Sequence, residues 1–214
     1  MAVVDAKYEF IYVDVGTNGR ISDGGVWEGC SLKESLERQD IGLPPPCQLP
    51  RSEAIAPFVF VADDAFPLKP YLMKPFPFRH QTNEQRIFSY RLSRARRTVE
   101  NAFGILANRF RVLLKPINLE PAKVDKVVLA CVVLHNLLRR DTPDNYTPVG
   151  SMDREDLQAN KIVLGAWHSE GGLLPLQRNP RRVSDEAKAV REKFCAYFNH
   201  GGAVAWQREM AGLE

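Results

Sequence analysis

The feature that most constrains the fold of this chain is a short apolar run, Phe58 to Ala62, which ends in two aspartates. An uninterrupted run of this length predicts a strand that is buried on both faces, the kind found in α/β sheets. Ligands of such sheets lie at the carboxyl ends of the strands. Because Asp63 and Asp64 follow the run directly, the sequence predicts an α/β fold with carboxylates at its ligand-binding edge.

Two more strands are expected near the N-terminus. Residues 1–5 have the composition of the end of a buried strand, and residues 8–15 are rich in β-branched and aromatic residues. A chain that opens within a strand leaves an unpaired sheet edge. We therefore expect that a preceding strand is missing and that the isolated chain is poorly soluble.

Four segments carry the signals of helices. Thr82 and Gln85 form a capping-box pattern before a long segment whose apolar residues recur at steps of three and four. Ser184 and the acidic residues after it suit the start of a last helix. The expected helices cover about residues 24–38, with Ser22 and Asp23 as caps, 82–110, 122–140 and 185–198. In the third, the residues expected to face inward are Val124, Val127, Val128, Cys131, Leu134, Leu137 and Leu138.

The segment from Asp141 to Val183 has no such periodicity and is polar, with many Pro, Gly and Asn residues. It is expected to be a mostly disordered loop. The longest apolar run, Val127 to Leu134, is far too short to cross a bilayer, and no signal peptide is visible. The four cysteines lack metal-binding spacings, so free thiols in a reducing compartment are expected.

Asp63 lies where a metal ligand would lie, since Mg²⁺ takes one or two carboxylates and keeps several waters. The alternative is a turn, because an aspartate after a strand often bonds to its own backbone, and position alone favours the turn. Asp23 has a similar alternative as a helix N-cap.

Glu100 borders the apolar face of the long helix, in a window from Glu84 to Lys115 where basic residues dominate. A helix of this charge can bind phosphate groups. The alternatives are that Glu100 forms an ion pair with Arg96 or Arg97 and that the arginines are a solvated face. The candidate DNA-binding residues are Arg91, Arg94, Arg96, Arg97, Arg109 and Arg111.

Together these residues resemble the nuclease domain of PIF/Harbinger transposases and their domesticated relatives. The similar segments are VADDAFPLKPYLMKPF (61–76), FSYRLSRARRTVENAFG (88–104), RFRVL (109–113) and LACVVLHN (129–136). Residues 14–23 are similar to the segment that follows the family's third strand. The resemblance covers about residues 1–140.

The resemblance implies an RNase H-like mixed sheet flanked by helices, here lacking the first strand. Residues 1–140 would form a partial nuclease domain, 141–183 a disordered loop, and 184–214 a C-terminal helix and tail. Asp63 and Glu100 would be catalytic and would bind a divalent cation, Mg²⁺ or Mn²⁺, with Asp23 as a further ligand. The implied partners are DNA and a separate DNA-binding protein, with no membrane, and the implied location is the nucleus.

The family's first catalytic aspartate lies on a strand upstream of the strand that Met1 to Asp5 would end. We therefore expect this chain by itself to show no Mg²⁺-dependent strand cleavage. The alternatives to an active nuclease are a non-catalytic remnant that binds DNA or protein through the basic helix, and an incomplete gene sequence.

Overall fold

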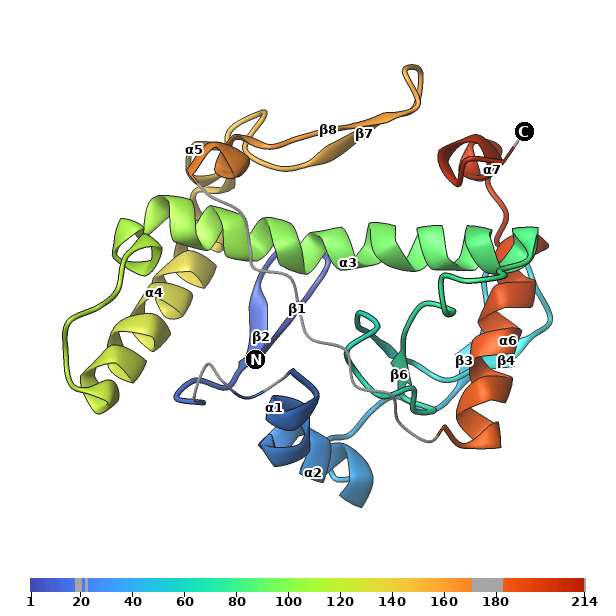
Figure 1. Ribbon diagram of the computed structural model, residues 1–214, viewed down its shortest axis with the longest axis horizontal. Helices are drawn as coiled ribbons and strands as arrows, with labels where there is room; N and C mark the ends of the chain where they lie inside the picture. Colours follow the sequence, from blue (N-terminus) through green and yellow to red (C-terminus); the bar gives the residue numbers. More distant parts are fainter. Residues whose placement is uncertain (18–20, 22, 171–182, 214) are drawn as a thin grey trace. The chain divides into compact units, whose positions relative to one another are not determined.

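The computed structural model describes residues 1–17, 21, 23–170 and 183–213 (Figure 1). The chain divides into two compact units. The first unit comprises Met1–Ile21 and Arg97–Pro175, and the second comprises Ser22–Arg96 and Leu176–Glu214. Helices and short strands occur in both, which confirms the α/β class. The strands of the described part pair only two by two, in three antiparallel ladders and one parallel ladder.

The first unit is built on an antiparallel hairpin of β1 (Ala2–Val4) and β2 (Phe10–Val13). The predicted second strand is confirmed, although it is shorter than residues 8–15. Its Phe10 ring packs in a core with Ala102, Leu106 and Cys131, which come from the long helices α3 (Asn83–Arg109) and α4 (Pro121–Asp141). A short 3-10 helix, η1 (Arg111–Leu114), begins directly after α3.

The outer face of α4 differs from the prediction. Cys131 is buried as expected, together with Val132 and His135. Leu134 and Leu137, predicted to face inward, are 44% and 50% exposed. Apolar residues occur around most of the circumference of α4. The sequence therefore indicates a helix but does not show which of these residues the β1–β2 hairpin covers. The exposed apolar face of α4 comprises Leu129, Val133, Leu134 and Leu137.

The segment after α4 is more ordered than the sequence suggests. It forms α5 (Pro143–Tyr146), an antiparallel hairpin of β7 (Arg154–Asp156) and β8 (Lys161–Val163), and a 3-10 helix η2 (Ala166–Glu170). The prediction of a disordered loop is therefore wrong for residues 141–170, and residues 171–182 of that segment lie outside the described part. These elements are too short to show a period, and contacts with α3 hold them in place.

The second unit begins with α1 (Asp23–Gly29) and α2 (Ser31–Arg38), where one helix was predicted. Cys30 interrupts them with an extended backbone, and its Sγ accepts a hydrogen bond from the Lys33 N–H (3.4 Å) as the N-cap of α2. The predicted cap Ser22 lies outside the described residues. A small antiparallel ladder of β3 (Cys47–Gln48) and β4 (Ile55–Ala56) follows.

The apolar run gives β5 (Phe60–Val61), which pairs in parallel with β6 (Leu72–Met73). The strand prediction is confirmed, but burial on both faces is wrong, since Phe58 is 46% and Val61 37% exposed. Among the described strands β6 is the sole partner of β5, so no further strand extends this ladder into a broad sheet.

Helices α3 and α6 behave as predicted at their starts. The Thr82 Oγ1 accepts from the Gln85 N–H and the Gln85 Oε1 accepts from the Thr82 N–H, each at 3.3 Å, which confirms the capping box. Ser184 caps α6 (Asp185–Asn199) by accepting from the Ala187 N–H. The second unit's core lies between the start of α3 and α6 and contains Leu68, Met73, Phe76, Phe88, Leu92, Ala187 and Cys195.

A last short helix, α7 (Gln207–Met210), completes the second unit. None of the described helices combines the length and apolar character that a bilayer crossing needs. All four cysteines are free thiols, as predicted, and Cys47 alone among them is exposed.

Candidate functional site

Asp63 lies immediately beyond the parallel ladder of the second unit. The ladder ends where the Ala62 N–H donates to the Met73 carbonyl (2.9 Å), and the Asp63 side chain follows, only 13% exposed. Its Oδ1 accepts a hydrogen bond from the Ala65 N–H at 2.9 Å. This is the turn that was expected from the position of Asp63 directly after a strand. The carboxylate therefore has a fixed orientation at the end of β5. One of its oxygens is used by the backbone.

The second oxygen of Asp63 faces a cation. Arg96 Nη2, from α3, lies 3.9 Å from Asp63 Oδ2, and the Arg96 side chain is 23% exposed. This distance is at the outer limit for an ion pair. The Arg96 guanidinium therefore faces the carboxylate but does not make the short, two-pronged contact of a bidentate arginine–carboxylate pair. The neighbouring Asp64 takes part through its backbone, since its carbonyl accepts from Lys74 Nζ at 2.9 Å.

Glu100 lies on α3 in the first unit and is partly buried. The arginines suggested as its ion-pair partners have other carboxylates beside them. Arg97 donates from Nη1 to Glu155 Oε1 at 3.0 Å, and these side chains are 12% and 4% exposed. Arg96 lies beside Asp63. Arg96 and Arg97 thus each lie beside an acid that is distant in the sequence.

Asp23 is the first residue of α1, so it lies at the start of a helix as the sequence predicts. Its side chain lies outside the described part of the structure. Asp63 belongs to the second unit and Glu100 to the first. Within the residues that the structure describes, no group of three or more His, Cys, Asp or Glu side chains is placed to hold a metal ion.

The arginines of α3 in the second unit make tertiary contacts and do not form a solvated face. Arg91 donates from Nη1 to the Gly202 carbonyl (3.1 Å) and to Gln207 Oε1 (2.9 Å), and its guanidinium lies 4.6 Å from the centre of the Phe198 ring. Burial, and then the charge of Arg94, lowers the pKa of Arg91. Arg94 lies over the Trp206 ring, 4.2 Å from its centre.

In the first unit, Arg109 holds the end of α3 to α5. Its Nε donates to the Tyr146 carbonyl at 2.9 Å, and its guanidinium lies 5.6 Å from the centre of the Tyr146 ring. Arg111 begins η1 and is exposed to solvent. Of the six arginines proposed to bind DNA, Arg91, Arg97 and Arg109 each donate a tertiary hydrogen bond at 2.9 or 3.0 Å.

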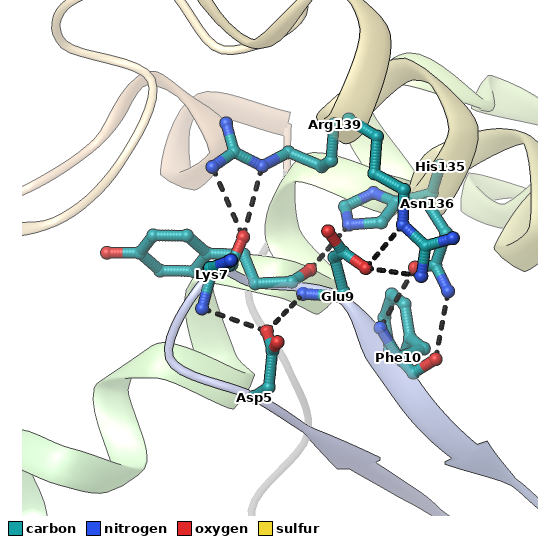
Figure 2. Close-up of polar contacts among 9 residues, drawn as sticks. Asp5, Lys7, Glu9, Phe10, His135, Asn136 and Arg139 are labelled. Carbon is teal, nitrogen blue, oxygen red and sulfur yellow. Dashed lines mark hydrogen bonds and ion pairs between the residues drawn. The ribbon is translucent and has the colours of Figure 1, made fainter.

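The adjacent His135 and Asn136 of α4 have a role that the sequence did not indicate. His135 is fully buried, with Nδ1 2.9 Å from the Tyr146 hydroxyl and Nε2 2.8 Å from the Tyr8 carbonyl. The Asn136 amide both donates to and accepts from the Phe10 backbone, at 2.9 Å each. Figure 2 shows both side chains directed at the turn of the β1–β2 hairpin.

The basic residues one turn further along α4 complete this attachment. Arg139 donates from Nε and Nη2 to the Lys7 carbonyl, both at 3.2 Å, and Arg140 lies 2.6 Å from the Glu9 carboxylate (Figure 2). Inside the turn, Asp5 Oδ1 accepts from the Lys7 and Glu9 N–H groups at 2.8 and 2.9 Å. These contacts assign a structural role to the end of the LACVVLHN segment.

Asn101 and Gly104 of α3 hold the chain that follows α5. Asn101 is 2% exposed, and its Oδ1 accepts from the Asp153 N–H (2.8 Å) and the Trp167 indole N–H (3.0 Å). A Cβ at Gly104 would lie 2.2 Å from the Trp167 ring, so the ring occupies the space of the missing side chain. Asp153 in turn contacts His168 Nε2 at 2.9 Å.

Comparison of the sequence with known families shows which family the chain belongs to. Residues 1–136, the segment that carries Asp63, Glu100 and the His135-Asn136 pair, match the family described as DDE superfamily endonuclease, and the chain belongs to that family. It is similar to Protein ALP1-like from Arabidopsis thaliana, with 24% identity over 190 residues that make up 88% of this chain. The chain spans 42% of the length of that relative. No solved structure matches it.

Proposed function

We propose that this chain derives from a Harbinger-type transposase nuclease, a class that binds DNA and acts on its phosphodiester bonds with a divalent cation, Mg²⁺ or Mn²⁺, and that cleavage by this chain alone is impaired. The observation that carries the proposal is the family match, which includes both Asp63 at the end of β5 and Glu100 on α3. An RNase H-like arrangement of the sheet and location in the nucleus are parts of the same proposal.

Asp63 and Glu100 are the residues that would hold the cation, with Asp23 as a further ligand. Their donor chemistry fits, because Mg²⁺ and Mn²⁺ prefer hard carboxylate oxygens. A bound divalent ion supplies Lewis acidity at phosphorus-bound oxygens and lowers the pKa of its water. The chain's own contribution at Asp63 is orientation, through the Ala65 N–H and the Arg96 guanidinium.

The DNA would lie against basic residues. Arg111 is exposed to solvent, whereas use of Arg91, Arg97 or Arg109 for DNA would break the contacts described above. We therefore propose that Arg111 contacts a phosphate directly, and that Arg91, Arg97 and Arg109 position the helix. A separate DNA-binding protein could supply further affinity and target choice.

A second candidate function is a non-catalytic DNA- or protein-binding module. The contact that favours it is between Arg96 and Asp63, because a guanidinium lies on the Asp63 oxygen that a metal ion would use. In such a module the ion pair would be a permanent part of the fold, and the basic residues would act in binding alone.

A cleavage assay separates the two functions. Supercoiled plasmid is incubated with the chain and Mg²⁺ or Mn²⁺, and nicked product is measured for the wild type, Asp63→Asn and Glu100→Gln. Asp40→Asn, which changes an exposed acid that is not among the proposed ligands, is the matched control. Nicking that both site variants lose and the control keeps supports the nuclease. Salt-sensitive DNA binding without nicking supports the binding module.

A further inference from the structure

The loop that joins β6 to α3 can be followed in Figure 1, and it carries an exposed aromatic side chain, Phe78. Phe78 is 90% exposed, whereas Phe76, two residues before it, is 6% exposed. The residues that follow Phe78, Arg79 and His80, are exposed as well. Exposing an entire phenyl ring to water is unfavourable. A ring in this position is therefore a candidate contact for a ligand with an apolar surface.

Both ends of the exposed tip are fixed to the body of the second unit. The Phe76 ring packs edge-on against Phe88 with centres 5.3 Å apart, and the Arg191 guanidinium lies 3.9 Å from its centre. The Phe76 N–H donates to Ser89 Oγ at 3.3 Å. Gln81 Nε2 donates to the Phe76 carbonyl at 2.8 Å and reaches the same Ser89 Oγ at 3.4 Å.

These contacts leave residues 77–80 as a short projection between two anchors. Its first residue is Pro77, whose ring restricts the backbone angle φ. Its last residue, His80, has a left-handed backbone conformation (φ 60°) that is typical of a tight turn. Little conformational entropy would be lost when such a tip binds, because its position is already set. The exposure of Phe78 is thus a property of an ordered turn.

The charge around the tip identifies the ligand. Arg79, which follows Phe78 directly, is exposed, and no Asp or Glu occurs in the sequence between Ala65 and Asn83. An aromatic ring beside cationic side chains matches a nucleic acid, whose bases stack on the ring while its phosphates contact the charges. Apolar side chains of DNA-binding proteins also insert between base steps and unstack them.

We propose that Phe78 is a base-stacking wedge that contacts DNA, with Arg79 on an adjacent phosphate. The proposal rests on the proposed function, since it requires that the chain bind DNA. It adds a specific contact that none of the candidate carboxylates or α3 arginines provides.

The test uses the full chain and a duplex with 2-aminopurine at its centre, a base whose fluorescence rises when it unstacks. The wild type is expected to bind and to raise the fluorescence. Phe78→Ala is expected to bind about 5- to 100-fold more weakly, in line with the loss of one stacked base, and to leave the fluorescence low. Phe78→Trp should restore both signals. In Arg79→Ala, the slope of log K against log salt concentration should become less steep by about one, because one phosphate contact is lost.

The control is Val149→Ala, which truncates a 97% exposed apolar side chain in the first unit and should behave as the wild type. Equal thermal midpoints for all variants show that folding is intact. Equal affinity and equal fluorescence for the wild type and Phe78→Ala would overturn the wedge while the DNA-binding function stands. A wild type that binds no duplex at low salt would overturn both.

Discussion

The side-chain amide of Asn136 makes with the Phe10 backbone the two hydrogen bonds that a neighbouring strand would make. Its Nδ2 donates to the Phe10 carbonyl and its Oδ1 accepts from the Phe10 N–H, both at 2.9 Å (Figure 2). Helix α4 is thereby attached to β2 at one defined residue. A carboxylate cannot replace this amide, because it has no N–H to donate.

This attachment predicts a loss of stability in Asn136→Ala. Two partly buried backbone groups of Phe10 would lose their partners, so we expect the free energy of unfolding to fall by about 1–3 kcal/mol. Asn136→Asp should be destabilised as well, since only one of the two bonds can form. Urea unfolding monitored by circular dichroism measures both. The exposed Lys126→Ala on the same helix serves as control, and equal midpoints for all these proteins would contradict the prediction.

His135 predicts a dependence of stability on pH. Burial lowers the pKa of its imidazole, so the folded state holds the ring neutral where the unfolded chain, with a pKa of about 6.5, gains a proton. The stability that the neutral ring contributes is therefore complete above about pH 6.5 and falls as the pH is lowered below it. Urea midpoints between pH 5 and 8 should show this fall, and the gap between the wild type and His135→Gln should narrow toward pH 5. A constant gap would show that the buried imidazole does not titrate as described.

Gly104→Ala tests how the chain after α5 is seated on α3. The added Cβ would lie 2.2 Å from the Trp167 ring, so the ring must move and the Asn101–indole hydrogen bond should weaken. We expect a cost of about 1–3 kcal/mol, as for other small-to-large changes at packed sites. Combining it with Trp167→Ala should cost less than the sum of the two single changes. If the stability losses of the two single variants simply add in the double variant, residues 104 and 167 do not interact and the prediction is wrong.

Thiol reactivity should distinguish the four cysteines. Cys47 is exposed, while burial raises the pKa of Cys195 to about 11 and also raises that of Cys131. At pH 8 a disulfide reagent such as DTNB should label one thiol rapidly in the native protein and the others only on unfolding. Cys47→Ser should remove the rapid phase. A rapid phase that persists in this variant would mean that a buried thiol is accessible.

The exposed apolar face of α4 predicts self-association. Val133 is 65% exposed and Leu137 50% exposed, so replacing both by lysine removes apolar surface without disturbing the buried side of the helix. The variant should stay monodisperse at concentrations where the wild type aggregates, with an unchanged thermal midpoint. Light scattering during concentration provides the measurement, and aggregation at the same concentration would rule out this face as its cause.

Local signals in the sequence predicted those parts of the fold that depend on neighbours in the chain. Thr82 with Gln85, and Ser184 with the N–H groups that follow it, form caps in which both partners lie within a few residues of each other. The helix beginnings were therefore predictable. The strand at Phe60–Val61 was predictable from its apolar character, but the exposure of its faces depends on which other parts of the chain pack against them.

The candidate site shows the opposite case. Motif similarity singled out Asp63 and Glu100, but the arginines around them could not be assigned from spacing. The partner of Arg97 is Glu155, and Arg91 is bound by Gln207, both remote in the sequence. A run of arginines in a helix gives no indication of which carboxylate or carbonyl will meet each one. The order in residues 143–170 was missed for the same reason, because it depends on Asn101 and Gly104 of α3.

The fit of the Trp167 ring against Gly104 also has a consequence for how the family can diverge. Each position restricts the other, since a side chain at 104 has room only where the residue at 167 is small. A larger residue at 104 should therefore cost less stability when it is paired with a smaller one at 167 than when it is introduced alone. Among homologues with both segments, a glycine at 104 should accompany an aromatic residue at 167, and the two should change together.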